Sequence, residues 1–181
     1  CIIRYTYLGF AQFRTWLIDY SRDNPNIVRT YAVRFCGCTL GNYLITHNDS
    51  GDKPKLYIIN QEGEKIMEIE INQLKNKDWE DIAADSENYY IADTGNNYGT
   101  RENLKIYILD KDFFLQGKIS IRYQSQTTFS RQLKNKYDAE ALAVVGDQLV
   151  LFSKNRKTLK SEISVIVGIS VPDGLLKKSS W

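Results

Sequence analysis

Glu80-Asp81-Ile82-Ala83-Ala84 and Glu140-Ala141-Leu142-Ala143-Val144 show the same pattern when Glu80 is placed opposite Glu140. The residues that follow stay in step without a gap, so that residues 88–92 fall on residues 148–152. Both stretches contain a short apolar segment, a polar turn, a second apolar segment and a polar loop, which is the pattern of antiparallel strands joined by a hairpin. An internal repeat of strand pairs is therefore predicted to organise the chain.

A third copy of the pattern lies upstream, because residues 42–46 match residues 88–92. Apolar residues in these segments alternate or run together, and they do not recur at the 3.6-residue period of a helix. The segments are therefore predicted to be strands. A helix is expected only over residues 8–20, where apolar and aromatic residues share one face. Further strands are predicted over residues 55–59, 65–71, 105–109, 118–123 and 162–171.

Four-stranded antiparallel units that repeat every ~40–50 residues are typical of β-propeller blades. The chain is accordingly predicted to be all-β and β-propeller-like, with about three antiparallel blades near residues 41–75, 76–125 and 136–172. Closed propellers contain roughly four to eight blades, so residues 41–181 are expected to form a partial propeller, a fragment of a longer ring. Residues 1–40 are an atypical N-terminal segment, in which a short helix and then a strand are expected.

The composition is that of a soluble protein that buries a core, with 43% hydrophobic and 25% charged residues. The net charge is only +2 and the basic residues are dispersed, so nucleic acid is not expected as a partner. The densest basic cluster is predicted to be a solvated loop, and a phosphate-binding patch is the alternative. This cluster comprises Lys154, Arg156, Lys157 and Lys160.

The N-terminal residues carry no recognisable export or membrane signal. Charged residues interrupt the apolar positions of residues 1–20, so neither a signal peptide nor a transmembrane segment is predicted. The first residue is Cys1 rather than methionine, so a processed or incomplete chain is expected. Cys1, Cys36 and Cys38 provide too few ligands for a zinc site, and they are expected to be free thiols.

Carboxylates recur at the start of two of the predicted blades. Glu80 and Glu140 occupy equivalent positions, and the first strand of a propeller blade lines the central channel. Both side chains are therefore expected to face one shared opening. Calcium takes roughly six to eight oxygen ligands, and converging carboxylates would suit it; the alternative is that Asp and Asn only form turns here. The candidate metal ligands are Glu80, Asp81, Asp93, Asp138 and Glu140.

Two polar loops form a candidate ligand-binding site. Its residues are His47, Asn48, Asp49, Asn96, Asn97 and Arg101. His47 is the only histidine in the sequence, and no Gly-x-Ser-x-Gly motif accompanies it. Arg101 is expected to pair with Asp93, and binding of an anion is the alternative. No complete catalytic constellation is present in the sequence, which leaves enzymatic activity open and inclines against it.

Four motifs together resemble a family of exported bacterial β-propeller proteins, common in Bacteroidetes, that has no assigned activity. The motifs are Thr46-His47-Asn48-Asp49-Ser50-Gly51, Asp78-Trp79-Glu80-Asp81-Ile82-Ala83, Ile91-Ala92-Asp93-Thr94-Gly95-Asn96-Asn97 and Tyr137-Asp138-Ala139-Glu140-Ala141-Leu142. The resemblance covers residues 42–156. The family is similar to six-bladed phytase-like, gluconolactonase-like and SdiA-regulated propellers. The resemblance thus implies a six-bladed ring and a location in the periplasm, at the cell surface or outside the cell.

The chain departs from this family over residues 1–40. Family members carry an acidic Glu-x-Ser-Gly-Leu segment ahead of the first loop, where this chain has Arg34-Phe35-Cys36-Gly37-Cys38. A frameshift, gene decay or a wrong gene start would explain the difference. Three functions follow as hypotheses: a binding or interaction scaffold for a small molecule or a protein, a calcium-dependent hydrolase of phosphoester or lactone type, and a truncated remnant without a function of its own.

Overall fold

A computed structural model describes residues 39–40 and 43–167 as strands, turns and loops, which confirms the all-β prediction for this part of the chain. The helix predicted over residues 8–20 lies outside the described residues, as does the end of the strand predicted over residues 162–171. The chain divides into two compact units, residues 1–77 and residues 78–181. No helix in the described ranges is long and apolar enough to cross a membrane.

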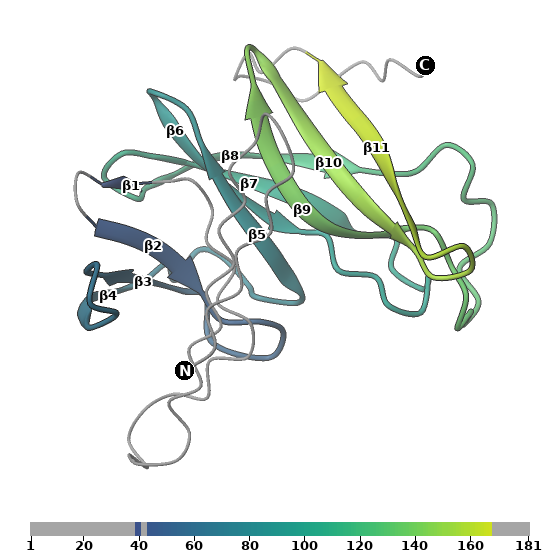
Figure 1. The fold of residues 1–181 in the computed structure, drawn as a ribbon, viewed down its shortest axis with the longest axis horizontal. Coiled ribbons are helices and arrows are strands. Elements are labelled where there is room, and N and C mark those ends of the chain that lie inside the picture. Colours follow the sequence, from purple (N-terminus) through teal and green to yellow (C-terminus); the bar gives the residue numbers. More distant parts are fainter. Residues whose placement is uncertain (1–38, 41–42, 168–181) are drawn as a thin grey trace. The chain divides into compact units, whose positions relative to one another are not determined.

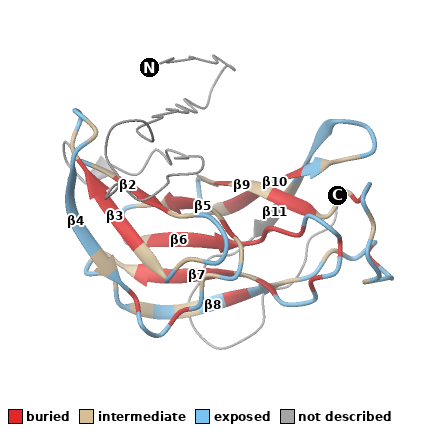
Figure 2. Cartoon of the chain, turned by 90° about the horizontal axis from the view of Figure 1, so that it is seen from below, coloured by how far each residue is buried: buried red, intermediate tan, exposed pale blue. Residues whose placement is uncertain are grey.

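The described part of the first unit contains one antiparallel sheet of four strands (Figure 1). The strands follow one another in chain order as β1 (Thr39–Leu40), β2 (Tyr43–His47), β3 (Lys55–Ile59) and β4 (Lys65–Glu70). Aromatic and β-branched residues give β3 its strand preference, and the strand is buried over most of its length. Its neighbour β4 is largely exposed, as the pale blue colour in Figure 2 shows. The core of this unit therefore lies around β2 and β3.

The second unit begins with another four-stranded antiparallel sheet. Its strands are β5 (Trp79–Ala84), β6 (Asn88–Asp93), β7 (Leu104–Asp110) and β8 (Leu115–Ile121), again in chain order. The central strands β6 and β7 are buried nearly throughout (red in Figure 2), whereas β8 alternates between exposed and less exposed residues. This alternation is what a strand with one solvated face shows.

A three-stranded antiparallel sheet completes the described part of the second unit. It consists of β9 (Asp138–Val145), β10 (Gln148–Asn155) and β11 (Lys160–Val167), with β10 in the middle. The matching segments of the sequence, residues 88–92 and 148–152, lie in β6 and β10, so each is the second strand of its sheet. The structure thus contains three antiparallel sheets; that they are propeller blades remains a prediction.

Several strand boundaries differ by one or more residues from those that the sequence predicts, and two of the differences have a clear physical cause. The first predicted loop starts with Thr46, but β2 continues through His47, and both side chains are buried. The strand predicted over residues 118–123 begins earlier, at Leu115, because a tight turn precedes it. In that turn Phe113 adopts a left-handed φ of 66° and its amide donates to the carbonyl of Asp110 at 3.1 Å. A bulky residue rarely adopts this conformation, so a phenylalanine at this position does not predict a turn.

Candidate functional site

The two equivalent glutamates each occupy a β-bulge. In the ladder between β5 and β6, Trp79 pairs with Asp93 and Asp81 pairs with Ala92, so Glu80 is the extra residue. A bulge adds a residue to one strand and redirects its side chain, and bulges are frequent near functional sites. The glutamate that repeats in the sequence therefore coincides with a β-bulge in the backbone.

The bulge in the third sheet has the same construction. Ala139 pairs with Ser153 and Ala141 pairs with Phe152, which leaves Glu140 as the extra residue in β9. Each first strand thus presents an Asp-x-Glu sequence in which the glutamate is bulged. Asp78 directly precedes β5, whereas its counterpart Asp138 is the first residue of β9.

The first strands of the two sheets in the second unit, β5 and β9, lie side by side (Figure 1). The amide of Leu142 in β9 donates a hydrogen bond of 2.8 Å to Oδ2 of Asp81 in β5. The other carboxylate oxygen of Asp81 accepts from the amide of Ile82 at 2.9 Å. Asp81 is buried, and its carboxylate is used to join the two sheets.

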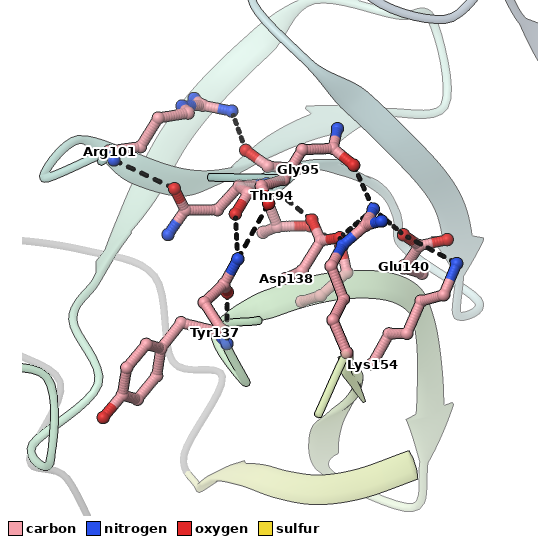
Figure 3. Close-up of polar contacts among 12 residues, drawn as sticks. Thr94, Gly95, Arg101, Tyr137, Asp138, Glu140 and Lys154 are labelled. Atoms are coloured by element: carbon pink, nitrogen blue, oxygen red, sulfur yellow. Dashed lines mark hydrogen bonds and ion pairs between the residues drawn. The ribbon is translucent and has the colours of Figure 1, made fainter. Parts of the chain in front are cut away.

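The loop after β6 also binds to β9 (Figure 3). The hydroxyl of Thr94 donates to the carbonyl of Ala139 at 3.0 Å, and the amide of Asn96 donates to Oδ1 of Asp138 at 2.7 Å. Both side chains of this loop are buried. Asn96, a candidate of the predicted ligand-binding site, and Thr94 of the same loop therefore hold the start of β9 in place.

Asp138, labelled in Figure 3, forms an ion pair with Arg156. Oδ2 of Asp138, a fully buried residue, accepts from Nε of Arg156 at 3.0 Å and from Nη2 at 2.7 Å. Nη2 also lies 3.7 Å from Glu140, which in turn lies 3.8 Å from Nζ of Lys154. The hydrogen bond to Asp138 raises the pKa of Arg156, and the charges of Glu140 and Glu80 raise it further. The guanidinium therefore compensates the acids of β9 at any accessible pH.

Arg101 forms the second ion pair, with Asp93, as the sequence predicts. Its Nη2 donates to Oδ1 of Asp93 at 2.7 Å and its Nη1 donates to the carbonyl of Gly95 at 2.7 Å. Only 8% of the Arg101 side chain and 1% of the Asp93 side chain are exposed. Arg101 thus stabilises the loop after β6 through buried contacts, and its guanidinium is not accessible to an anion in solution.

The carboxylates of Asp78 and Glu80 meet on one side of the same loop. Oxygen atoms of the two groups lie within 4.8 Å of each other. Both pack against Gly95, where a Cβ atom would overlap them. Two carboxylates at this separation can share a hard cation. Of the two, only Glu80 belongs to the predicted calcium ligands, and calcium stays a prediction. Sequence reasoning missed Asp78 as a site residue, although its match to Asp138 in the repeat could have revealed it.

The remaining ligand-loop candidates lie in the first unit. His47 is buried at the end of β2, and its Nδ1 donates to the carbonyl of Asn48 at 2.9 Å. The side-chain Nδ2 of Asn48 donates to the carboxylate of Asp52, and Asn76 Nδ2 donates to the backbone carbonyls of Asn48 and Asp49 at 3.1 and 3.0 Å. These bonds are typical of a closed turn. Three of the six candidates thus belong to the first unit and three to the second, and a single ligand-binding site formed by all six stays a prediction.

Asn135 and Arg156 are the polar residues of the second unit that sequence reasoning undervalued. Arg156 was expected in a solvated loop, but it is half-buried beside Asp138. Nδ2 of Asn135 donates to the carbonyl of Asn97 at 2.8 Å, and the residue is buried. Two buried atoms, Asp93 Oδ2 and Asn96 Nδ2, have no hydrogen-bond partner among the described residues. Such atoms are ordinarily satisfied by water or by a ligand.

Comparison with known proteins adds no further constraint on these residues. The geometry must therefore be interpreted from the contacts of the chain itself. No protein-family model matches this sequence, and no curated protein shows significant similarity to it.

Proposed function

We propose that the chain acts as a binding or interaction scaffold built from β-propeller blades. The observation that carries this proposal is that three of the candidate metal ligands are engaged in structural contacts. Asp81, Asp93 and Asp138 are buried, and they bind backbone amides or arginines that fix the loops of the second unit. Acids committed in this way build a rigid surface, which is what a binding scaffold requires.

The same contacts argue against a metal-dependent hydrolase at these positions. A calcium site needs carboxylates whose charge is available to the ion. Asp93 and Asp138 each lie 2.7 Å from a guanidinium nitrogen, and a cation beside them would be repelled by that guanidinium. Removing the arginine to admit a metal would leave a buried charge without its partner, which is costly.

The arrangement of strands supports the propeller part of the proposal. Blades are antiparallel meanders in which strands follow chain order, and two of the sheets have four strands in that order. In the second unit the first strands of successive sheets, β5 and β9, are neighbours, as they would be around a channel. The proposed six-bladed ring and export from the cell rest on the resemblance of the motifs.

A calcium-dependent hydrolase is the second candidate, and the convergence of Asp78 and Glu80 favours it. In this hypothesis the pair would help to hold calcium, which would polarise a phosphoester or lactone and activate water. Glu80 is the residue to test, because it is bulged and half-buried and its carboxylate lies against Gly95.

The two candidates differ in their response to calcium. Thermal unfolding of the purified chain is measured with calcium and with a chelator, and hydrolysis of p-nitrophenyl phosphate and of a simple lactone is followed in parallel. For a scaffold we expect a cooperative transition with the same midpoint in both conditions and no hydrolysis. A calcium-dependent rise in the midpoint, with turnover that Glu80→Gln abolishes and the exposed control Glu87→Gln retains, would establish the hydrolase instead. Absence of any cooperative transition would support the remnant hypothesis.

A further inference from the structure

The segment that joins β8 to β9 is an unusually long loop, drawn in green in Figure 1. Residues 122–137 contain no strand or helix, and loops beyond roughly 12–15 residues without secondary structure are uncommon and often functional. Its conformation is fixed by buried side chains. Nε2 of Gln126 donates to the carbonyl of Gly99 at 2.7 Å, and Asn135 binds the carbonyl of Asn97. We therefore treat this loop as a formed surface.

The loop is strongly basic. Residues 113–137 contain no Asp or Glu, whereas Arg122, Arg131, Lys134 and Lys136 fall within the loop. None of these four cations forms an ion pair with a carboxylate in the part of the chain that the structure describes. Arg101 and Arg156, by contrast, are both paired with aspartates. Arg101 and Arg156 thus stabilise loops of the chain itself, whereas the four cations of residues 122–137 have no carboxylate partner among the described residues.

Three of these cations lie over aromatic rings: Lys136 Nζ is 5.6 Å from the ring centroid of Tyr137, and the other two are arginines. The guanidinium of Arg131 lies 4.2 Å from the ring centroid of Tyr98, and that of Arg122 lies 5.5 Å from the ring of Phe129. Tyr98 belongs to the loop after β6, and its carbonyl accepts from the amide of Gln132 at 2.8 Å. A guanidinium held over a ring keeps its N–H donors for a carboxylate. Ring contact therefore prepares these arginines for an anionic partner.

An apolar side chain stands among the charges. Leu133 is 71% exposed and Tyr98 is 45% exposed, whereas more of the large apolar side chains in the described ranges are buried than exposed. A basic surface with exposed apolar residues complements a ligand that carries both acidic and apolar groups. Nucleic acid would need open ring faces on which bases stack, and the loop's own cations cover one face of Tyr98 and of Phe129. An acidic peptide is the better match.

We propose that residues 122–137 together with Tyr98, here called the basic loop surface, bind an acidic peptide segment that also carries apolar side chains. The inference rests on the proposed scaffold function and names the class of partner. Arg131 and Lys134 bind carboxylates of the peptide, while Leu133 contacts an aliphatic or aromatic side chain. Because the contacts are largely electrostatic, affinity falls as the salt concentration rises.

Binding of a fluorescent peptide that alternates Glu and Leu tests the proposal. The double variant Arg131→Gln and Lys134→Gln removes two exposed charges, and we expect the dissociation constant to rise about tenfold. The matched control, Lys118→Gln and Lys160→Gln, removes the same charge from exposed strand positions and should bind as the unmodified chain does. Leu133→Ser should weaken binding while leaving its salt dependence unchanged. Circular dichroism melts confirm that each variant folds.

Several results would overturn the proposal. Equal loss in the test and control variants would mean that only net charge matters. No binding of the peptide, or equal binding of a peptide with Gln in place of Glu, would exclude an acidic peptide partner. Tighter binding of a single-stranded oligonucleotide or of a sulfated polysaccharide at the same residues would assign the surface to another class. Each of these results leaves the scaffold function standing, because that function is tested separately by the absence of calcium-dependent hydrolysis.

Discussion

The starts of β5 and β9 have the same β-bulged backbone conformation, but the charges of their acidic side chains are compensated differently. Both carry Asp-x-Glu with a bulged glutamate. In β9 the loop after the second strand supplies Arg156, which binds Asp138 and approaches Glu140. In β5 the corresponding loop supplies Gly95, whose missing side chain leaves room for the carboxylates of Asp78 and Glu80. The same bulge is thus combined with two different chemical surroundings.

The difference shows which property of the repeat is retained. A bulge is specified by strand pairing, which depends on backbone hydrogen bonds and on the apolar residues on either side. The side chains that surround it come from loops, which vary more freely than strands. Geometry is therefore common to the two sheets, while charge is set locally. The experiments below act on matched positions in the two sheets.

The largest effect is expected at Asp93 and its counterpart Ser153, which pair with the residue before each bulge. Asp93→Ala leaves the buried Arg101 without its carboxylate, so we expect the free energy of unfolding to fall by about 3–5 kcal/mol. Ser153 shares a hydrogen bond of 2.8 Å with the hydroxyl of Tyr123, so Ser153→Ala should cost only about 1 kcal/mol. Urea unfolding measures both. Similar losses at the two positions would contradict the contrast.

A smaller effect is expected at Gly95. Gly95→Ala introduces a Cβ that overlaps the carboxylates of Asp78 and Glu80, and we expect a loss of about 1–3 kcal/mol as these groups are displaced. Gly117→Ala is the matched control, because no atom lies within 4 Å of the added Cβ there and alanine is favoured in a strand by up to ~1 kcal/mol. Equal stability of the two variants in urea would show that the carboxylates move aside freely.

The pH dependence of stability tests the contact between the Tyr123 hydroxyl and Ser153 of the third sheet. Burial raises the pKa of Tyr123 to about 12, from an ordinary value of 10.0. The folded state therefore holds the phenol proton more tightly, and this contribution is complete below pH ~10 and is lost as pH rises towards ~12. Tyr123→Phe should cost about 1 kcal/mol near pH 8, and the difference from the unmodified chain should shrink near pH 11. A difference that is constant with pH would refute the assignment.

The smallest effect is expected at Glu140, whose contacts with Arg156 and Lys154 are 3.7 and 3.8 Å long and partly exposed. Glu140→Gln should change the free energy of unfolding by no more than ~1 kcal/mol, because solvent screens such pairs. Added salt should reduce even this difference. A loss comparable to that of Asp93→Ala would mean that the bulged glutamate, rather than the aspartate, anchors the region.

The strands were largely predictable from the sequence, because their signals are local. Residues 55–59 were predicted as a strand and form β3 with the same bounds. Residues 105–109 lie within β7, which extends one residue further at each end. Short apolar runs bounded by polar turns suffice for this level of prediction. The left-handed Phe113 was not predictable, since local preference disfavours it and only the surrounding turn stabilises it.

The site was predictable only where partners lie close in the sequence. Arg101 and Asp93 are separated by one loop, and their pairing was predicted and is present. Arg156 binds Asp138 from the far end of a hairpin, and Asn135 binds the loop after β6. The first contact depends on the register of the β9–β10 hairpin and the second on how the two sheets pack, and no local pattern encodes either. The sequence therefore indicated which polar residues matter, but it did not indicate which of them form hydrogen bonds and ion pairs within the folded chain.

The hydrogen bonds that cross from β5 and its loop to β9 determine how small a piece of this unit can exist alone. If the chain were cut between β8 and β9, Asp81 would lose the amide of Leu142, and Asp138 would lose that of Asn96. Each half would then contain a carboxylate, Asp81 or Asp138, that is buried in the intact unit and has lost a backbone hydrogen-bond donor. We therefore expect the pair of sheets, rather than the single repeat, to be the smallest segment that can be expressed, transplanted or duplicated as a folded module.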